Sequence, residues 1–137
     1  MLFPLLKRQP HNSTLQNGTE ILAKIIRFLS LDLDEVGVIN YEITALNKEA
    51  KIIFNPYIDA GVTNEDANWE EKFWEIQDVK HTGNEAFVTA RTFKTHFVAT
   101  TFMHNTISPK ASPTPPKEGL IKTVDKVMLN YEVDVLN

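Results

Sequence analysis

Three carboxylates stand close together at Asp32, Asp34 and Glu35, and closely spaced carboxylates are the ligands that calcium prefers. A calcium loop of the EF-hand type that began at Asp32 would have Gly37 at its sixth position, as that motif requires. Its fifth and twelfth positions would hold a valine and an isoleucine, whose side chains carry no oxygen ligand. We therefore expect a solvated linker here and no metal site.

The histidines offer a second chemistry, either metal binding or proton transfer. His96 and His104 share one face of a predicted strand, but the rise of a strand separates them by roughly 27 Å, too far to share one metal. Asp78 and His81 lie near the tip of a predicted hairpin, where neither side chain would be buried. The sequence therefore predicts no catalytic residue, no metal site, no cofactor and no enzymatic activity.

Composition narrows the class of protein further. The chain has 137 residues, no cysteine, a net charge of -4, 42% hydrophobic residues and 23% charged residues. The absence of cysteine excludes disulfides, thiolate catalysis and cysteine-ligated zinc. The scattered basic residues and the negative net charge argue against direct nucleic-acid binding. No stretch approaches the ~20 apolar residues that span a bilayer, so no membrane span is predicted.

The sequence predicts a β-sheet, and the strongest strand pattern lies in residues 73–104. Apolar and polar residues alternate there through three predicted strands joined by two short turns. Threonine and aromatic residues, which favour a pleated surface, are frequent in this stretch. Gly83 and Asn84 suit the first turn because both accept positive φ. We expect the remaining chain to extend or cover this sheet.

Residues 20–29 are predicted to form a short helix. Their isoleucine and leucine residues fall on one broad face at helical spacing, with Lys24 and Arg27 turned to water. Thr19 is a suitable N-cap, and Glu20 would lie at the positive end of the helix dipole. A helix of this length is marginal alone, so we expect it to pack on the sheet.

Further strands are expected on either side of this stretch. Residues 36–46 and 51–54 are predicted to form a hairpin, and residues 59–68 an exposed acidic loop. Prolines make residues 108–119 an extended loop. The cleanest strand signal comes last, where inward-facing residues alternate with polar ones: Val127, Leu129, Tyr131, Val133 and Val135.

These elements predict an α+β fold, with one short helix packed on a mainly antiparallel sheet of about six strands. A single domain covers residues 1–137, a length that suits one hydrophobic core. Within it we expect an extended arm at 1–18, a helix and β-sheet core at 19–107, a proline-rich loop at 108–119 and the final strand at 120–137.

The arm and the loop suggest an interaction surface. The apolar arm either packs on its own domain or docks on a neighbouring subunit. Aromatic residues before the first strand of the sheet either pack at its rim or anchor an interface. The expected partners are copies of the chain itself and neighbouring structural proteins. The candidate interface residues are Leu2, Phe3, Leu5, Leu6, Trp69, Phe73, Pro113, Pro115 and Pro116.

The stretch from Trp74 to Arg91 reads Ile-x-x-Val-x-x-x-Gly-Asn-x-Ala-x-Val-x-Ala-Arg from its third residue, and it resembles a hairpin of the NTF2-like cone fold. That resemblance implies a small-molecule-binding or enzymatic domain of the cone or barrel type. An apolar cavity would then be lined by Tyr41, Trp74, Phe87 and Tyr131.

The leading hypothesis is a non-enzymatic structural subunit of a large homo-oligomeric assembly. It rests on two extended segments that a lone globule does not need, and on the lack of a clustered acid, base or nucleophile. By analogy of architecture, the predicted setting is a virion component such as a bacteriophage tail or neck protein, assembled in the host cytoplasm. The NTF2-like pocket domain is the alternative.

Overall fold

The computed structural model describes residues 9–14, 17–63, 72–108 and 117–135, and within these ranges all regular structure is β-strand. Ten strands are present there, and none of the described residues is helical. The predicted α+β fold is therefore wrong. No helix among the described residues could cross a membrane.

The chain divides into two compact units. The first unit comprises Met1–Ile52, Ala111–Thr114 and Asp134–Asn137. The second unit comprises Ile53–Lys110 and Pro115–Val133. Each unit is described by itself below, and the single domain expected over residues 1–137 stays a prediction.

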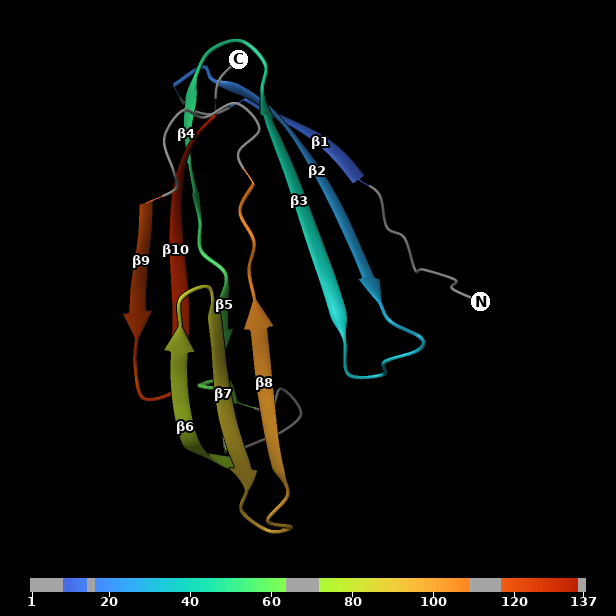
Figure 1. Ribbon diagram of the computed structural model, residues 1–137, viewed down its shortest axis with the longest axis vertical. Coiled ribbons are helices and arrows are strands. Elements are labelled where there is room, and N and C mark those ends of the chain that lie inside the picture. Colours follow the sequence, from blue (N-terminus) through green and yellow to red (C-terminus); the bar gives the residue numbers. More distant parts are fainter. Residues whose placement is uncertain (1–8, 15–16, 64–71, 109–116, 136–137) are drawn as a thin grey trace. The chain divides into compact units, whose positions relative to one another are not determined.

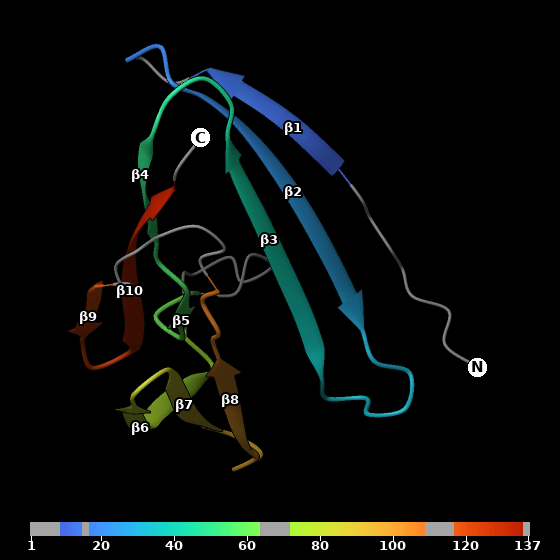
Figure 2. The same ribbon diagram turned by 45° about the horizontal axis from the view of Figure 1, so that its top comes forward.

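The first unit contains an antiparallel sheet of β1 (Gln9–Thr14), β2 (Glu20–Leu29) and β3 (Gly37–Ala45), with β2 in the middle. Both views show β2 and β3 as a long hairpin (Figures 1 and 2). The loop between them is closed by Ser30, whose N–H donates to the carbonyl of Val36 at 2.8 Å. The Ser30 hydroxyl also accepts the N–H of Leu33 at 2.9 Å.

Strand β2 replaces the predicted helix, and its sequence explains the error. Residues at spacing i, i+4, such as Ile21, Ile25 and Leu29, share a helix face, but they also share a strand face because four is an even number. The intervening positions include Leu22 and Ile26, so polar residues do not mark a wet face. Pairing with β3 over Ile21–Leu29 and with β1 over Glu20–Ile25 satisfies most backbone groups of β2, and this decides between the two structures.

In the second unit, β6 (Trp74–Thr82), β7 (Glu85–Thr92) and β8 (Val98–His104) form an antiparallel sheet in sequence order. The prediction of three strands and two short turns in 73–104 is confirmed. Gly83 has a φ of 55° in the first turn, as expected for a glycine in this position. A register shift between Ile76 and Asp78 marks a bulge in β6.

A third sheet centres on β10 (Lys126–Val135), which pairs with β4 (Ala50–Phe54), β5 (Tyr57–Asp59) and β9 (Lys117–Lys122). The predicted hairpin of 36–46 with 51–54 is wrong, since β3 and β4 belong to different sheets. β5 begins before the predicted acidic loop and extends into it, and the predicted proline-rich loop ends in β9. β5 was missed because its partner, β10, lies far along the chain. β9 was missed because it begins among the prolines of the predicted loop, although it pairs with the neighbouring β10.

The core of the second unit confirms the alternation predicted for the last strand. Val127, Leu129, Tyr131 and Val133 are all buried, and Val127 packs with residues of β6 and β7. Burial of each such side chain contributes about 1.5–3 kcal/mol. The core cluster consists of Val79, Ala86, Val88 and Val127, with Ile58, Ala60, Ile76 and Met103 packed against it.

Candidate functional site

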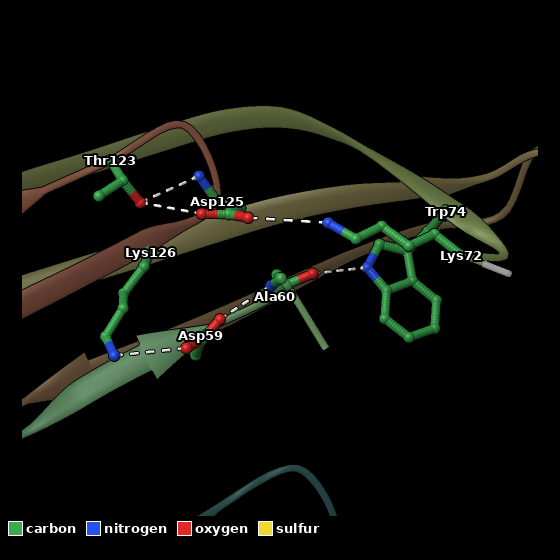
Figure 3. A network of polar contacts seen from close by, with 8 residues as sticks. Asp59, Ala60, Lys72, Trp74, Thr123, Asp125 and Lys126 are labelled. Carbon is green, nitrogen blue, oxygen red and sulfur yellow. Dashed lines mark hydrogen bonds and ion pairs between the residues drawn. The ribbon is translucent and has the colours of Figure 1, made fainter. Parts of the chain in front are cut away.

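Two carboxylates and two lysines meet in the second unit, where β5 ends and β10 begins (Figure 3). The antiparallel register sets Lys126 opposite Asp59, and the Lys126 Nζ lies 3.3 Å from an Asp59 carboxylate oxygen. The Lys72 Nζ lies 3.7 Å from Asp125. We call these four side chains the carboxylate–lysine cluster.

Backbone hydrogen bonds fix the cluster in place. The N–H of Ala60 donates to the carbonyl of Asp125 at 2.9 Å. The indole N–H of Trp74 donates to the carbonyl of Ala60 at 3.0 Å (Figure 3). The Thr123 hydroxyl donates to the Asp125 carboxylate at 2.9 Å. The segment after β5 is thus tied both to the start of β10 and to the start of β6.

Gly61 lies within the same cluster, and a side chain there would displace the Asp125 carboxylate. Its N–H donates to the Asp59 carboxylate at 2.9 Å. A Cβ at this position would stand 2.5 Å from an Asp125 carboxylate oxygen and 3.1 Å from an Asp59 oxygen. Glycine at this position therefore lets the Asp125 carboxylate keep its contacts with Thr123 and Lys72.

The pKa of Asp59 is lowered from its ordinary value. The largest cause is the hydrogen bond from the Gly61 N–H, and Lys126 lowers the pKa further through its hydrogen bond and its charge. A general acid needs the opposite shift, because it must hold its proton near the working pH. Asp59 is therefore suited to a fixed ionised role, and Lys126, which also lies 4.3 Å from the Tyr57 ring centroid, balances its charge.

The titratable residues that the sequence singled out lie elsewhere. His96 sits in the turn before β8 with a φ of 54°, whereas His104 lies in β8 with its Nδ1 3.1 Å from Glu85. Asp78 pairs with Lys80 at 2.5 Å, and this pairing lowers the pKa of Asp78. Among the residues that the structure describes, no group of histidine and acidic side chains is placed to hold a metal ion.

The candidate interface residues fall mostly outside the described residues. Phe73 is described: it is exposed, and its carbonyl accepts the N–H of Phe93 at 2.9 Å. Docking of these residues on other copies of the chain stays a prediction. The candidates outside the described residues are Leu2, Phe3, Leu5, Leu6, Trp69, Pro113, Pro115 and Pro116.

The residues expected to line a cavity have other surroundings. Trp74 belongs to the polar network described above, and the Phe87 ring lies 5.9 Å from the Lys80 Nζ. Tyr131 is buried, and this burial raises the pKa of its hydroxyl, with a further contribution from the charge of Glu118. Tyr41 is exposed on β3 of the first unit.

Sequence reasoning missed the carboxylate–lysine cluster. Asp59 and Lys126 are separated by about half of the chain, and they meet only through the pairing of β5 with β10. One signal was available: residues 59–68 are acidic and contain Gly61, which is typical of a loop whose backbone approaches other groups closely. That signal does not identify the two lysines.

The fold belongs to a known class of carbohydrate-active enzyme domain. The structure of a putative kojibiose phosphorylase from the human microbiome matches 96% of this chain with a TM-score of 0.74, at 18% sequence identity. Residues 5–136 match the glycosyl hydrolase family 65 N-terminal domain. The chain belongs to that family.

A curated relative agrees with this assignment. The maltose phosphorylase of Bacillus subtilis (strain 168) is 37% identical over 71 residues, which make up 52% of this chain. The chain spans only 9% of the length of that relative and 16% of the length of the kojibiose phosphorylase chain.

The family membership corrects the functional hypotheses. A non-enzymatic virion component, a phage tail or neck protein, and a location in the virion are all wrong, because the relatives are bacterial enzymes that act on carbohydrates. The NTF2-like alternative is also wrong, although the β6–β7 hairpin exists. The structural-subunit hypothesis rests on two extended segments and on the lack of a clustered acid, base or nucleophile. Both features are equally expected of one domain of a larger enzyme.

Proposed function

We propose that the chain is the N-terminal β-domain of a phosphorylase that cleaves a disaccharide of two glucose units with inorganic phosphate. The observation that carries the proposal is the match of residues 5–136 to the glycosyl hydrolase family 65 N-terminal domain. The substrate class follows from the names of the two relatives, since maltose and kojibiose are both disaccharides of glucose.

The proposed reaction has simple requirements. A phosphate oxygen bonds to the anomeric carbon as the glycosidic C–O bond breaks, and the departing sugar oxygen takes a proton from a general acid. The products are glucose 1-phosphate and glucose. Carboxylic acids usually provide the acid in glycoside cleavage, and their pKa must be raised for the task.

The carboxylate–lysine cluster does not match that role. Asp59 has a lowered pKa, and its partners are a backbone N–H and Lys126. Asp125 accepts a hydrogen bond from the Thr123 hydroxyl and pairs with Lys72. We assign the cluster to holding the segment after β5 against β6 and β10, and we place the general acid in another part of the enzyme.

The test uses the longer polypeptide that carries this chain. With maltose or kojibiose it should release glucose 1-phosphate in the presence of phosphate and none in its absence. Asp59→Asn and Asp125→Asn should each leave kcat within about threefold of the parent, because loss of a general acid would cost about 10²–10⁴-fold.

Two results would contradict the proposal in different parts. Failure to consume phosphate with any glucose disaccharide would disprove the proposed phosphorylase activity. A folded Asp125→Asn enzyme whose kcat falls by about 10²-fold or more, with KM unchanged, would instead make the cluster part of the catalytic machinery.

A further inference from the structure

The far half of the β2–β3 hairpin presents an apolar face. Cross-strand partners share one face of a sheet, and the register pairs Arg27 with Ile39 and Ile25 with Tyr41. Leu29, opposite Gly37, lies on the same face two residues beyond Arg27. We call Leu29, Ile39 and Tyr41 the tip face.

Exposure rises along this face toward the end of the hairpin. Ala45 is buried, and Ile43, the next residue on this face, is partly buried. Tyr41 is then 52% exposed, Ile39 60% and Leu29 70%. The connecting loop adds more exposed apolar side chains, namely Leu31, Leu33 and Val36.

The opposite face of the same hairpin is more polar. Lys24 and Glu42 form an ion pair of 2.6 Å across the strands, and Asn40 is exposed between Ile39 and Tyr41 in sequence. Phe28 and Val38 also lie on this face, beyond Asn40. The tip face and its surroundings therefore combine exposed apolar side chains with one charge, that of Arg27. The reverse face combines an ion pair and an amide with Ile26, Phe28 and Val38.

We infer that the tip face docks on the remainder of the same polypeptide. The inference rests on the proposed function, because it requires that the chain is one domain of a longer enzyme. The relatives extend far beyond the matched part, since the match covers 9% of the length of one relative and 16% of the length of the other. Contiguous exposed apolar residues of this kind mark interaction sites, and domain interfaces within one chain commonly bury such patches.

The side chains of the tip face indicate what the partner surface must contain. Leu29 and Ile39 require an apolar patch, the Tyr41 hydroxyl requires a hydrogen-bond partner at its edge, and the exposed Arg27 favours a carboxylate at the rim. A covalently attached domain meets this face at a high effective concentration, so it occupies the face ahead of a second copy of the protein.

The test measures thiol reactivity at two neighbouring positions of the longer polypeptide. This chain has no cysteine, so Ile39→Cys and Asn40→Cys each introduce one reporter, and peptide mass spectrometry follows alkylation at that residue alone. The residues are adjacent but point to opposite faces of β3. Each rate is divided by the rate for the same variant unfolded in guanidinium.

Position 39 should be alkylated at least about tenfold more slowly than position 40 in the folded protein, because a covered thiol reacts only after local opening. Equal rates at the two positions would overturn the inference. Protection that disappears on dilution to a monomer would also overturn it, since a second copy would then be the occupant.

The phosphorolysis assay separates this inference from the proposed function. An active phosphorylase with equal rates at both positions would disprove only the docking. A protein that is inactive on glucose disaccharides but protected at position 39 would disprove only the activity.

Discussion

Strands β2 and β10 have the same length, ten residues each, but opposite surroundings. In β10 every second residue from Val127 to Val133 is buried, and the residues between them are more accessible. In β2 no residue is fully buried, and partial exposure runs through both faces. β10 lies in the middle of its sheet and against a core, whereas the β2–β3 hairpin ends in apolar side chains that face outward.

The difference shows what alternation in a sequence measures. A period of two appears where one face of a strand is buried within its own domain and the other is wet. Where both faces carry apolar residues, as in β2, the period is lost and a helix fits equally well. The loss of this period therefore indicates that the strand carries more apolar surface than its own unit buries.

The largest contrast should come from introducing a charge in β10 and another near the end of the β2–β3 hairpin. Val127→Asp places a carboxylate in the core, at a residue with 0% exposure, and should cost about 4 kcal/mol or more of unfolding free energy. Ile39→Asp on the exposed tip face should change the stability of the 137-residue chain by less than about 0.5 kcal/mol. Chemical denaturation measures both, and similar losses would show that the comparison is wrong.

A smaller effect is expected where backbone approaches the carboxylate–lysine cluster. Gly61→Ala forces a Cβ to 2.5 Å from an Asp125 oxygen and should cost about 1–3 kcal/mol. Gly119→Ala in β9 is the matched control, because its nearest contact is an ordinary 3.4 Å to Asn130. Denaturation midpoints should fall clearly for the first variant only. A stable Gly61→Ala chain would mean that the cluster is loosely held.

The cluster should also shape the acid stability of the second unit. The pKa of Asp59 is below its unfolded value of 3.8, so its stabilising contribution is present above that pH and is lost as the pH falls through the folded value. Asp59→Asn should therefore flatten the decline of stability in this acid range. Lys126→Met should flatten it less, since the Gly61 N–H, the larger cause of the shift, remains. Denaturation measured at a series of pH values checks this order. A larger flattening for Lys126→Met than for Asp59→Asn would assign the lowered pKa of Asp59 mainly to Lys126.

The smallest effect belongs to the polar face of the hairpin. Lys24 and Glu42 are both partly exposed, and exposed ion pairs of this kind contribute about 0.2–1 kcal/mol. A double-mutant cycle with Lys24→Ala and Glu42→Ala should give a coupling energy in that range and diminish with added salt. A coupling well above 1 kcal/mol would indicate that this face, too, is covered.

The sequence predicted those parts of the fold that depend on neighbouring residues. The three strands of 73–104 and the inward set of β10 follow from local alternation and from Gly83 in a tight turn. The pairing of β10 with β4 and β5, and hence the whole sheet order, depends on contacts between distant segments. No local pattern encodes those contacts.

The candidate site was even harder to predict from the sequence. Asp59 and Lys126 have ordinary sequence surroundings, and their pairing depends on a three-residue strand, β5, that is too short to show a period. The error in the predicted function had a related cause. Exposed apolar residues such as Leu29 and Ile39 indicate that a surface will be covered, but they do not say whether the cover is another protein or another part of the same one.

The central position of β10 also determines when the second unit can form during synthesis. β5 leaves the ribosome early, but its partner follows only after about half of the chain has been made. At ordinary translation speeds that delay is on the order of several seconds, far longer than a hairpin needs to close. The β6–β7–β8 sheet, whose strands pair in sequence order, can therefore assemble first, and β10 then arrives to pair with β5.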